Sequence, residues 1–302
     1  MNSDNCQAIA IVGPTASGKT SLGIALAQEF NGEIISADSR QIYRGMDIGT
    51  AKATPGEQAL VPHHLIDIRD LDENYTVADF KREATAAIED VLARRKLPVL
   101  VGGTGLYVKA LVENLDIPKI EADPALRQQI EREIAEKGLD AVFKKLVALD
   151  PEAAYVVDPK NPRRVVRALE VATLTGRPFT AQRKKQAPLY DFLIIGLDPP
   201  PDILRERIDR RIDRMMKDGL VDEVSGLVKK FGKNQTAFDA IGYREIIGHL
   251  DGKTTLGDAV AAMKLNTWHF AKRQMTWFRK DKNIRWISEK AEAEKLVRRF
   301  LR

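Results

Sequence analysis

The segment at residues 13–20 constrains this chain most, because it reads Gly-Pro-Thr-Ala-Ser-Gly-Lys-Thr and fits G-x-x-x-x-G-K-[ST] at every defined position. The apolar run at 8–12 before it predicts a buried strand, and the apolar spacing of 20–30 after it predicts a helix. In that setting backbone N–H groups turn inward around an anion, and the helix N-terminus adds its dipole. We therefore predict a pyrophosphate-binding loop made of Gly13, Pro14, Thr15, Ala16, Ser17, Gly18, Lys19 and Thr20.

Two side chains of this loop carry specific chemistry. Lys19 is placed to reach the terminal phosphate of a bound anion, and the Thr20 hydroxyl is placed to coordinate Mg²⁺. The loop indicates which anion is bound but leaves the reaction open, because many kinases share it.

Strand-like and helical segments alternate through the first hundred residues, which indicates an α/β fold with helices on both faces of a parallel sheet. Further strands are expected at 33–36, 98–101 and 192–197, with a candidate strand at 64–68 and a helix at 77–95. The sheet edge that carries the phosphate loop is therefore the expected place for a site.

The pattern becomes almost purely helical between residues 124 and 177, with helices expected at 124–137, 139–149 and 161–175. Gly138 and Gly176 stand where C-terminal caps belong. Long helices return at 201–217, 220–231 and 256–280. At roughly 150 residues per domain, 302 residues suggest about two domains. We predict a P-loop NTPase-like α/β core formed by 1–117 and 190–302, with an inserted all-helical domain at 118–189.

Two further loops should meet the phosphate loop, because parallel strands bring their carboxyl ends to one edge. The strand at 98–101 ends in Gly-Gly-Thr-Gly, without the metal-binding carboxylate of an NTPase. Its glycines allow close approach to a ligand and Thr104 supplies a hydroxyl, although a tight structural turn explains them equally well. Asp38 follows the strand at 33–36. It could bind a metal through water, remove a proton, or satisfy turn amides.

The composition, 44% hydrophobic and 30% charged, is typical of a globular protein and excludes a disordered or membrane chain. A single cysteine, Cys6, excludes an intramolecular disulfide framework and a cysteine-rich zinc site. The first residues lack a basic region, and the apolar run at 8–12 is too short for a signal peptide. No stretch approaches the roughly 18 apolar residues of a membrane helix, so we expect a cytoplasmic protein.

The charge balance is modest, with 48 basic and 43 acidic residues giving +5, but its distribution is uneven. Residues 160–185 hold eight basic side chains against one acid, Glu170. Residues 264–285 hold seven against Asp281, interleaved with aromatic residues such as Trp268. Each cluster alone is most simply a solvated helix face. Two clusters, one of them rich in aromatic side chains, favour a nucleic-acid partner.

The ordered motifs of the chain closely resemble those of the tRNA dimethylallyltransferases, also called tRNA isopentenyltransferases. Besides the phosphate loop, they are ADSRQIYRGMDIGTAK at 37–52, PHHLID at 62–67, YTVADF at 75–80, VGGTGLY at 101–107, NPRRVVRALE at 161–170, GLVDEV at 219–224, AIGYRE at 240–245 and AKRQMTWFR at 271–279. The resemblance extends from residue 8 to about 285, nearly the whole chain. The combination is far more specific than the phosphate loop alone.

This resemblance implies transfer of a dimethylallyl group from dimethylallyl pyrophosphate to the exocyclic N6 amine of the adenosine 3′-adjacent to the anticodon in tRNA. It implies that Asp38 accepts the amine proton as the new bond forms. Lys19, Thr20 with Mg²⁺, Thr104 and one arginine would neutralise the departing pyrophosphate. Arg211 best matches the motif position for that arginine, although Arg207 and Arg210 lie nearby in the sequence.

The resemblance also implies an interface with the tRNA anticodon stem-loop, whose target base must be flipped out of its stack. The base and its neighbours would be held by Asp38, Ser39, Arg40 and Gln41. The stem-loop would be gripped by Arg127, Arg163, Arg164 and Arg167 of the insertion, and contacted by Gly242, Tyr243, Arg244, Lys272 and Arg273. A monomer is expected.

Two other functions stay open on the residues alone. A small-molecule kinase of the nucleotide- or shikimate-kinase type shares the loop, the strand-end aspartate and the glycine turn, but has no need for two basic clusters. A nucleotide-gated RNA-binding protein without transfer activity would show ATP-dependent RNA affinity and form no product.

Overall fold

A parallel β-sheet organises the larger part of the chain, and the computed structural model describes residues 6–117, 120, 123–182 and 186–302. Its strands are β1 (Gln7–Val12), β2 (Gly32–Ser36), β3 (His63–His64), β4 (Leu97–Val101), β5 (Asp191–Leu197) and β6 (Arg285–Ile287). They lie side by side in the order β3-β2-β4-β1-β5-β6, and every neighbouring pair is parallel. The predicted α/β class is confirmed.

Strand β1 lies inside the sheet, between β4 and β5, which explains its unbroken apolar run. Ile9 is in register with Val99 of β4 and with Leu193 of β5. The five residues from Ala8 to Val12 have no exposed surface. A strand covered on both faces has no solvent side on which to carry polar residues.

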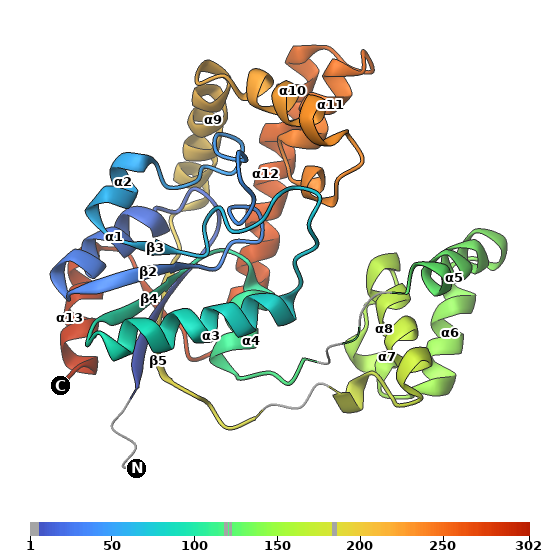
Figure 1. Cartoon of the computed structure of the whole chain (residues 1–302), viewed down its shortest axis with the longest axis horizontal. Coiled ribbons are helices and arrows are strands. Elements are labelled where there is room, and N and C mark those ends of the chain that lie inside the picture. Colours follow the sequence, from blue (N-terminus) through green and yellow to red (C-terminus); the bar gives the residue numbers. More distant parts are fainter. Residues whose placement is uncertain (1–5, 118–119, 121–122, 183–185) are drawn as a thin grey trace. The chain divides into compact units, whose positions relative to one another are not determined.

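Helices cover both faces of the sheet (Figure 1). On one face, Ile9 and Ile11 pack with residues of α1 (Lys19–Glu29) and α13 (Lys290–Phe300). On the other, Ala10 and Val12 pack with residues of α3 (Val77–Ala93) and α4 (Gly105–Val112). The alternation follows from the two-residue period of a strand. A short helix, α2 (Pro55–Leu60), precedes β3.

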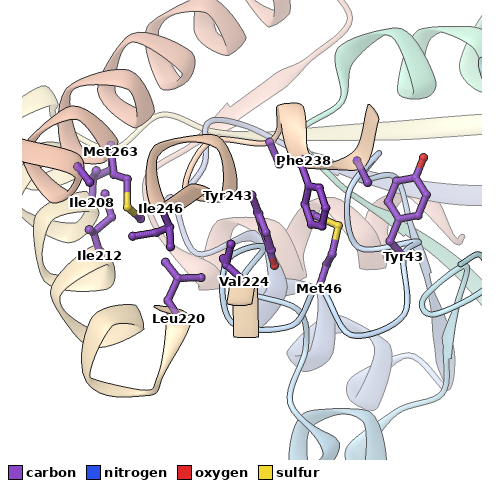
Figure 2. Packing of buried hydrophobic residues seen from close by; sticks show 14 of the residues in the cluster. Tyr43, Met46, Ile208, Ile212, Leu220, Val224, Phe238, Tyr243, Ile246 and Met263 are labelled. Carbon is purple, nitrogen blue, oxygen red and sulfur yellow. The ribbon is translucent and has the colours of Figure 1, made fainter. Parts of the chain in front are cut away.

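A second helical layer packs on the segment that follows β2. It consists of α9 (Pro201–Lys217), α10 (Leu220–Phe231), the 3₁₀ turn η2 (Thr236–Asp239), α11 (Tyr243–Leu250) and α12 (Leu256–Phe278). Figure 2 shows its core, in which Met46 lies next to Phe238, and Tyr243 lies between Val224 and Phe238. The helices expected at 201–217 and 220–231 are confirmed.

The chain forms two compact units, one built from the described residues up to Val112 with Pro188–Arg302, and the other from Glu113–Ala187. The smaller unit contains α5 (Pro124–Lys137), α6 (Leu139–Leu149), α7 (Ala153–Val156), α8 (Pro162–Thr175) and the 3₁₀ turn η1 (Thr180–Gln182). It has its own core, which includes Val142, Leu146 and Val165.

Caps at the helix ends of the smaller unit follow the sequence signals. The Asn161 side chain accepts the Arg164 N–H at the start of α8. The predicted C-caps at Gly138 and Gly176 are confirmed, and both glycines have positive φ. No helix among the described residues is both long enough and apolar enough to cross a bilayer.

The candidate strand at 64–68 is only partly present. Strand β3 covers His63 and His64 and ends there. Leu65 and Asp67 adopt left-handed conformations, with φ of 61° and 55°, which extended pairing does not allow. The amino-acid pattern at 64–68 carries no signal for such a conformation.

Candidate active site

The phosphate loop connects β1 to α1 and has the backbone of an anion cradle. Ala16 and Gly18 have φ of 62° and 97°, and such alternation with right-handed residues turns successive N–H groups to one side. No side chain caps α1 at Gly18, so the end of the helix can receive an anion. The Ser17 hydroxyl is buried and has no hydrogen-bond partner among the described residues. A bound anion would supply an acceptor for it.

Two cations converge on the loop. The Lys19 ammonium donates to the Pro14 carbonyl at 2.6 Å, and Arg211 Nη1 of α9 donates to Thr15 Oγ1 at 3.4 Å. Burial and the nearby Arg211 charge lower the pKa of Lys19 to about 7, while Asp38 opposes them. Burial likewise lowers the pKa of Arg211, again opposed by Asp38. Positive charge that is poorly solvated in the free protein favours a multiply charged anion.

Asp38 follows β2, and the two oxygens of its carboxylate have different environments. Its Oδ1 accepts the Arg40 N–H at 2.8 Å and, more weakly, the Gln41 N–H at 3.4 Å. Its Oδ2 receives no hydrogen bond from the described residues, and the side chain lines a cavity. The turn interpretation is therefore right for one oxygen, while the other remains available for a proton or a ligand.

The glycine turn after β4 packs directly against the Asp38 segment. A Cβ at Gly102 would collide with the Ala37 backbone, so only glycine fits there. The Thr104 N–H donates to the Ala37 carbonyl, and Thr104 Oγ1 accepts the Ser39 N–H at 3.1 Å. In this structure Thr104 holds the backbone beside Asp38, and its predicted contact with pyrophosphate remains a prediction.

Gln274 of α12 joins the phosphate loop to the glycine turn, a role that the sequence motifs did not predict. Its Oε1 accepts the Thr15 N–H at 2.8 Å, and its Nε2 donates to the Gly103 carbonyl at 2.9 Å. The residue is buried, with 7% of its surface exposed. A signal for Gln274 was present in the sequence, because this residue belongs to the AKRQMTWFR motif. It directly follows Lys272 and Arg273, and the motif was interpreted through those two charged residues.

These elements enclose a cavity of about 800 Å³. Its lining includes Thr15, Ala16, Ser17, Gly18, Lys19 and Thr20 of the loop, together with Asp38, Gln41, Gly102, Gly103, Arg211 and Gln274. Apolar side chains line it as well, among them Ile48, Met215 and Phe270. The cavity can therefore hold a molecule with an anionic end and a small apolar end.

The three candidate arginines of α9 have different positions. Arg211 lines the cavity, and neither Arg207 nor Arg210 does. Arg207 is exposed, and Arg210 is exposed and pairs with Glu206 one turn earlier, at 2.6 Å. The arginine that best matched the motif position is therefore the one at the cavity.

The predicted base-binding residues after Asp38 also have structural partners. Arg40 Nη1 donates to the Thr236 carbonyl at 3.0 Å, which ties this turn to η2. Gln41 Oε1 lies 3.3 Å from the Ser36 hydroxyl, which donates to it. Ser39 and Arg40 are partly exposed and do not line the cavity.

In the smaller unit, two of the predicted tRNA contacts bind an internal carboxylate. Arg127 Nε and Nη2 donate to Glu170 at 2.8 and 3.0 Å, and Arg167 Nη1 donates to it at 2.6 Å. Glu170 is fully buried, so both arginines contribute to the core of this unit. Arg163 and Arg164 lie exposed at the start of α8. RNA contact by all four arginines remains a prediction.

Tyr243 is a core residue, and the predicted contact of residues 242–244 with tRNA remains a prediction. Tyr243 has no exposed surface and lies in the core of the second helical layer (Figure 2). Gly242 beside it is also buried, whereas Arg244 is exposed and donates to Glu245. Spacing alone cannot distinguish the buried tyrosine of a helix start from an exposed one.

Lys272 and Arg273 lie exposed on α12. The Lys272 ammonium lies 5.6 Å from the centre of the Trp268 ring, and the Arg273 guanidinium lies 5.9 Å from that of Phe270. These pairs present charge and aromatic surface together, as the sequence pattern predicted.

The donor set near the loop fits Mg²⁺ better than a transition metal. Thr20 and Asp38 line the cavity and carry hard oxygen ligands. No cluster of three or more histidine, cysteine, aspartate or glutamate side chains occurs within the described ranges. Of the two adjacent histidines, His63 Nδ1 lies 2.7 Å from the Val61 carbonyl and His64 Nε2 lies 2.7 Å from Glu33.

Comparison with known proteins gives consistent matches over most of the chain. The model of the family described as IPP transferase matches residues 41–281. A tRNA dimethylallyltransferase of Roseiflexus sp. (strain RS-1) is 49% identical over 277 residues, covering 91% of each chain. One from Halalkalibacterium halodurans is 46% identical, covering 92% of this chain and 90% of its own.

Solved structures agree with these matches. A tRNA isopentenylpyrophosphate transferase from Bacillus halodurans has a TM-score of 0.72 at 43% identity, covering 98% of this chain and 95% of its own. A eukaryotic dimethylallyltransferase described as acting on tRNA has a TM-score of 0.76 at 32% identity, covering 90% and 69%.

Proposed function

Because the chain belongs to the IPP transferase family, we propose that its cavity binds dimethylallyl pyrophosphate and directs the dimethylallyl group to an adenosine of tRNA. The protein is a transferase that moves a dimethylallyl group to tRNA. The observation that supports the assignment of the site is the meeting of Lys19, Arg211 and an available Asp38 oxygen in one cavity. A pyrophosphate leaving group and a proton acceptor are the two features that such a transfer needs.

The residues suggest a division of roles in the reaction. The exocyclic amine of the adenosine attacks the first carbon of the allyl group, and the bond from that carbon to the pyrophosphate oxygen breaks. Pyrophosphate leaves with the electron pair of the broken bond, held by Lys19, Arg211 and the backbone N–H groups of the loop. Asp38 Oδ2 accepts the proton that the amine loses.

Mg²⁺ belongs to this proposal, with Thr20 as its protein ligand. When bound, it would neutralise part of the pyrophosphate charge. Mg²⁺ usually keeps several waters and binds through substrate phosphates rather than a protein cage. One hydroxyl on the cavity wall therefore suffices from the protein side.

The acceptor atom and the biological setting also belong to the proposal. From the motif resemblance we infer the N6 amine of the adenosine 3′-adjacent to the anticodon, presented by the anticodon stem-loop. Because the proposed substrate is tRNA, we expect the enzyme to act in the cytoplasm, and we expect it to be a monomer.

A mass measurement tests this function. The protein is mixed with an anticodon stem-loop RNA, Mg²⁺ and dimethylallyl pyrophosphate, and the RNA is weighed by mass spectrometry. We expect the mass of one five-carbon group on the adenosine next to the anticodon, and none when that adenosine is replaced by guanosine. An unmodified RNA would contradict the proposal. ATP-dependent phosphorylation of a small molecule would support the kinase alternative instead.

A further inference from the structure

One carboxylate outside the proposed site organises part of the cavity wall. Glu223 of α10 accepts the backbone N–H groups of Asp47, Ile48 and Gly49 at 3.0, 2.7 and 3.1 Å. It also accepts the Tyr243 hydroxyl at 2.5 Å. Three consecutive N–H groups outside a helix or a sheet need other acceptors, and here one carboxylate accepts all three in charge-assisted hydrogen bonds.

Tyr243 holds the Glu223 carboxylate by a hydrogen bond, and its ring lies directly against the backbone at Gly49. Burial and the neighbouring Glu223 raise the pKa of Tyr243, so its hydroxyl stays protonated and donates. A Cβ at Gly49 would collide with the Tyr243 ring. In Figure 2, Tyr243 lies beside Val224, and Met46 lies toward Phe238. The segment that begins at Asp47 therefore follows the core residue Met46 and is bound to the Glu223 carboxylate.

The segment held in this way faces the cavity. Asp47, Ile48, Thr50, Ala51 and Lys52 all line it. The buried Lys52 ammonium donates to Asp47 at 2.5 Å, and this bond joins the two ends of the segment 47–52. Ala51 has a φ of 49°, an unfavourable conformation for alanine that persists only when its surroundings hold it.

We propose that Glu223 is a positioning residue, which shapes the wall of the donor site by holding residues 47–49. The inference rests on the proposed function, since it takes this part of the cavity wall to contact bound dimethylallyl pyrophosphate. Ile48 presents an apolar side chain to the cavity while its N–H is held by Glu223 at 2.7 Å. Release of that N–H moves an apolar surface against which the five-carbon group packs.

Glu223→Gln tests the proposal in the full-length protein. Glutamine keeps the shape of glutamate but turns one of the two acceptor oxygens into a donor that faces N–H or O–H groups. We expect the KM for dimethylallyl pyrophosphate to rise about tenfold, kcat to change less than about threefold, and stem-loop affinity to stay the same. Hydrogen exchange at the amides of residues 47–49 should quicken about tenfold or more.

A matched substitution separates positioning from stability. Glu33 is a buried carboxylate with several hydrogen-bond partners, as Glu223 has, and it pairs with Arg94 and Lys96 away from the cavity lining. Glu33→Gln should lower the melting temperature and leave the donor KM unchanged. Should Glu223→Gln fail to fold, Gly49→Ala is the second variant, because its methyl group displaces the same segment and should raise KM in the same way.

The outcomes distinguish this inference from the proposed function. Wild-type transfer to the stem-loop tests the function, and the two variants relative to wild type test the role of Glu223. An unchanged donor KM in a folded Glu223→Gln enzyme, or unchanged exchange at residues 47–49, would overturn the inference. A tenfold higher KM with faster exchange would support it.

Discussion

The two oxygens of Asp38 have separable consequences, because one holds the turn and the other faces the cavity. Asp38→Asn keeps an acceptor for the Arg40 N–H but removes the base. We expect transfer to slow by about 10²–10⁴-fold in single-turnover measurements, the range for a lost general base. Stem-loop affinity should change less than about threefold, because the turn survives. A collapse of RNA binding with preserved transfer would show that Asp38 is an anchor rather than a base.

Lys19 predicts a pH dependence of donor binding. Its pKa of about 7 in the free protein must rise when pyrophosphate arrives, since an adjacent anion favours the ammonium form. Binding therefore takes up a proton above pH 7, and affinity falls as pH rises, by at most about tenfold per unit from this group. Calorimetry from pH 7 to 9 in buffers of different ionisation enthalpy counts the protons.

Lys19→Arg supplies the comparison for that experiment. The guanidinium stays charged through this range, so proton uptake from this position should vanish even if the affinity is lower. Equal proton uptake in both proteins would assign the titrating group elsewhere.

At the scale of elements, sequence reasoning succeeded where the signal is local. The strand, loop and helix around residues 13–20 are set by contiguous apolar runs and by glycine, so their positions could be predicted. Gln274 and Tyr243 depend on which face of α12 and α11 turns inward, and tertiary packing decides that. The left-handed Leu65 that ends β3 has no sequence signal of its own.

The stability of the helical unit should depend on pH through Glu170, the one acidic residue in the basic stretch 160–185. Burial alone would raise the pKa of Glu170, but hydrogen bonds from Arg127 and Arg167 outweigh it and lower that pKa. The carboxylate therefore stabilises the unit above the pKa of an unfolded glutamate, and the stabilisation is lost as pH falls through the lower folded value. Amides of α5 and α8 should lose protection from hydrogen exchange in acid before those of β1.

Glu170→Gln tests the same contact at neutral pH. The unfolding free energy of the unit should fall by about 2 kcal/mol, less than the 3–5 kcal/mol of a fully buried pair, because the two guanidiniums are 41% and 36% exposed. Exchange in β1 and β4 serves as the internal reference and should not change. Unaltered exchange in α5 and α8 would contradict the assigned role.

Across the whole molecule, the excess of five positive charges is small, yet its placement predicts salt-dependent RNA binding. Arg164 on α8 and Lys272 and Arg273 on α12 are exposed, in regions where basic residues outnumber acidic ones. Each phosphate contact releases counterions, so the logarithm of affinity falls linearly with the logarithm of salt. For about six contacts, stem-loop affinity should fall about a thousandfold between 50 and 200 mM salt.

Paired charge removals locate that footprint. Lys272→Gln with Arg273→Gln should reduce the slope by about 1.4–1.8, which corresponds to two lost phosphate contacts. Lys295→Gln with Arg299→Gln removes the same charge from exposed positions on α13, outside both basic clusters, and should leave the slope unchanged. Binding isotherms for both pairs at four or more salt concentrations measure the slopes. Equal slopes would mean that net charge, rather than the surface of α12, attracts the RNA.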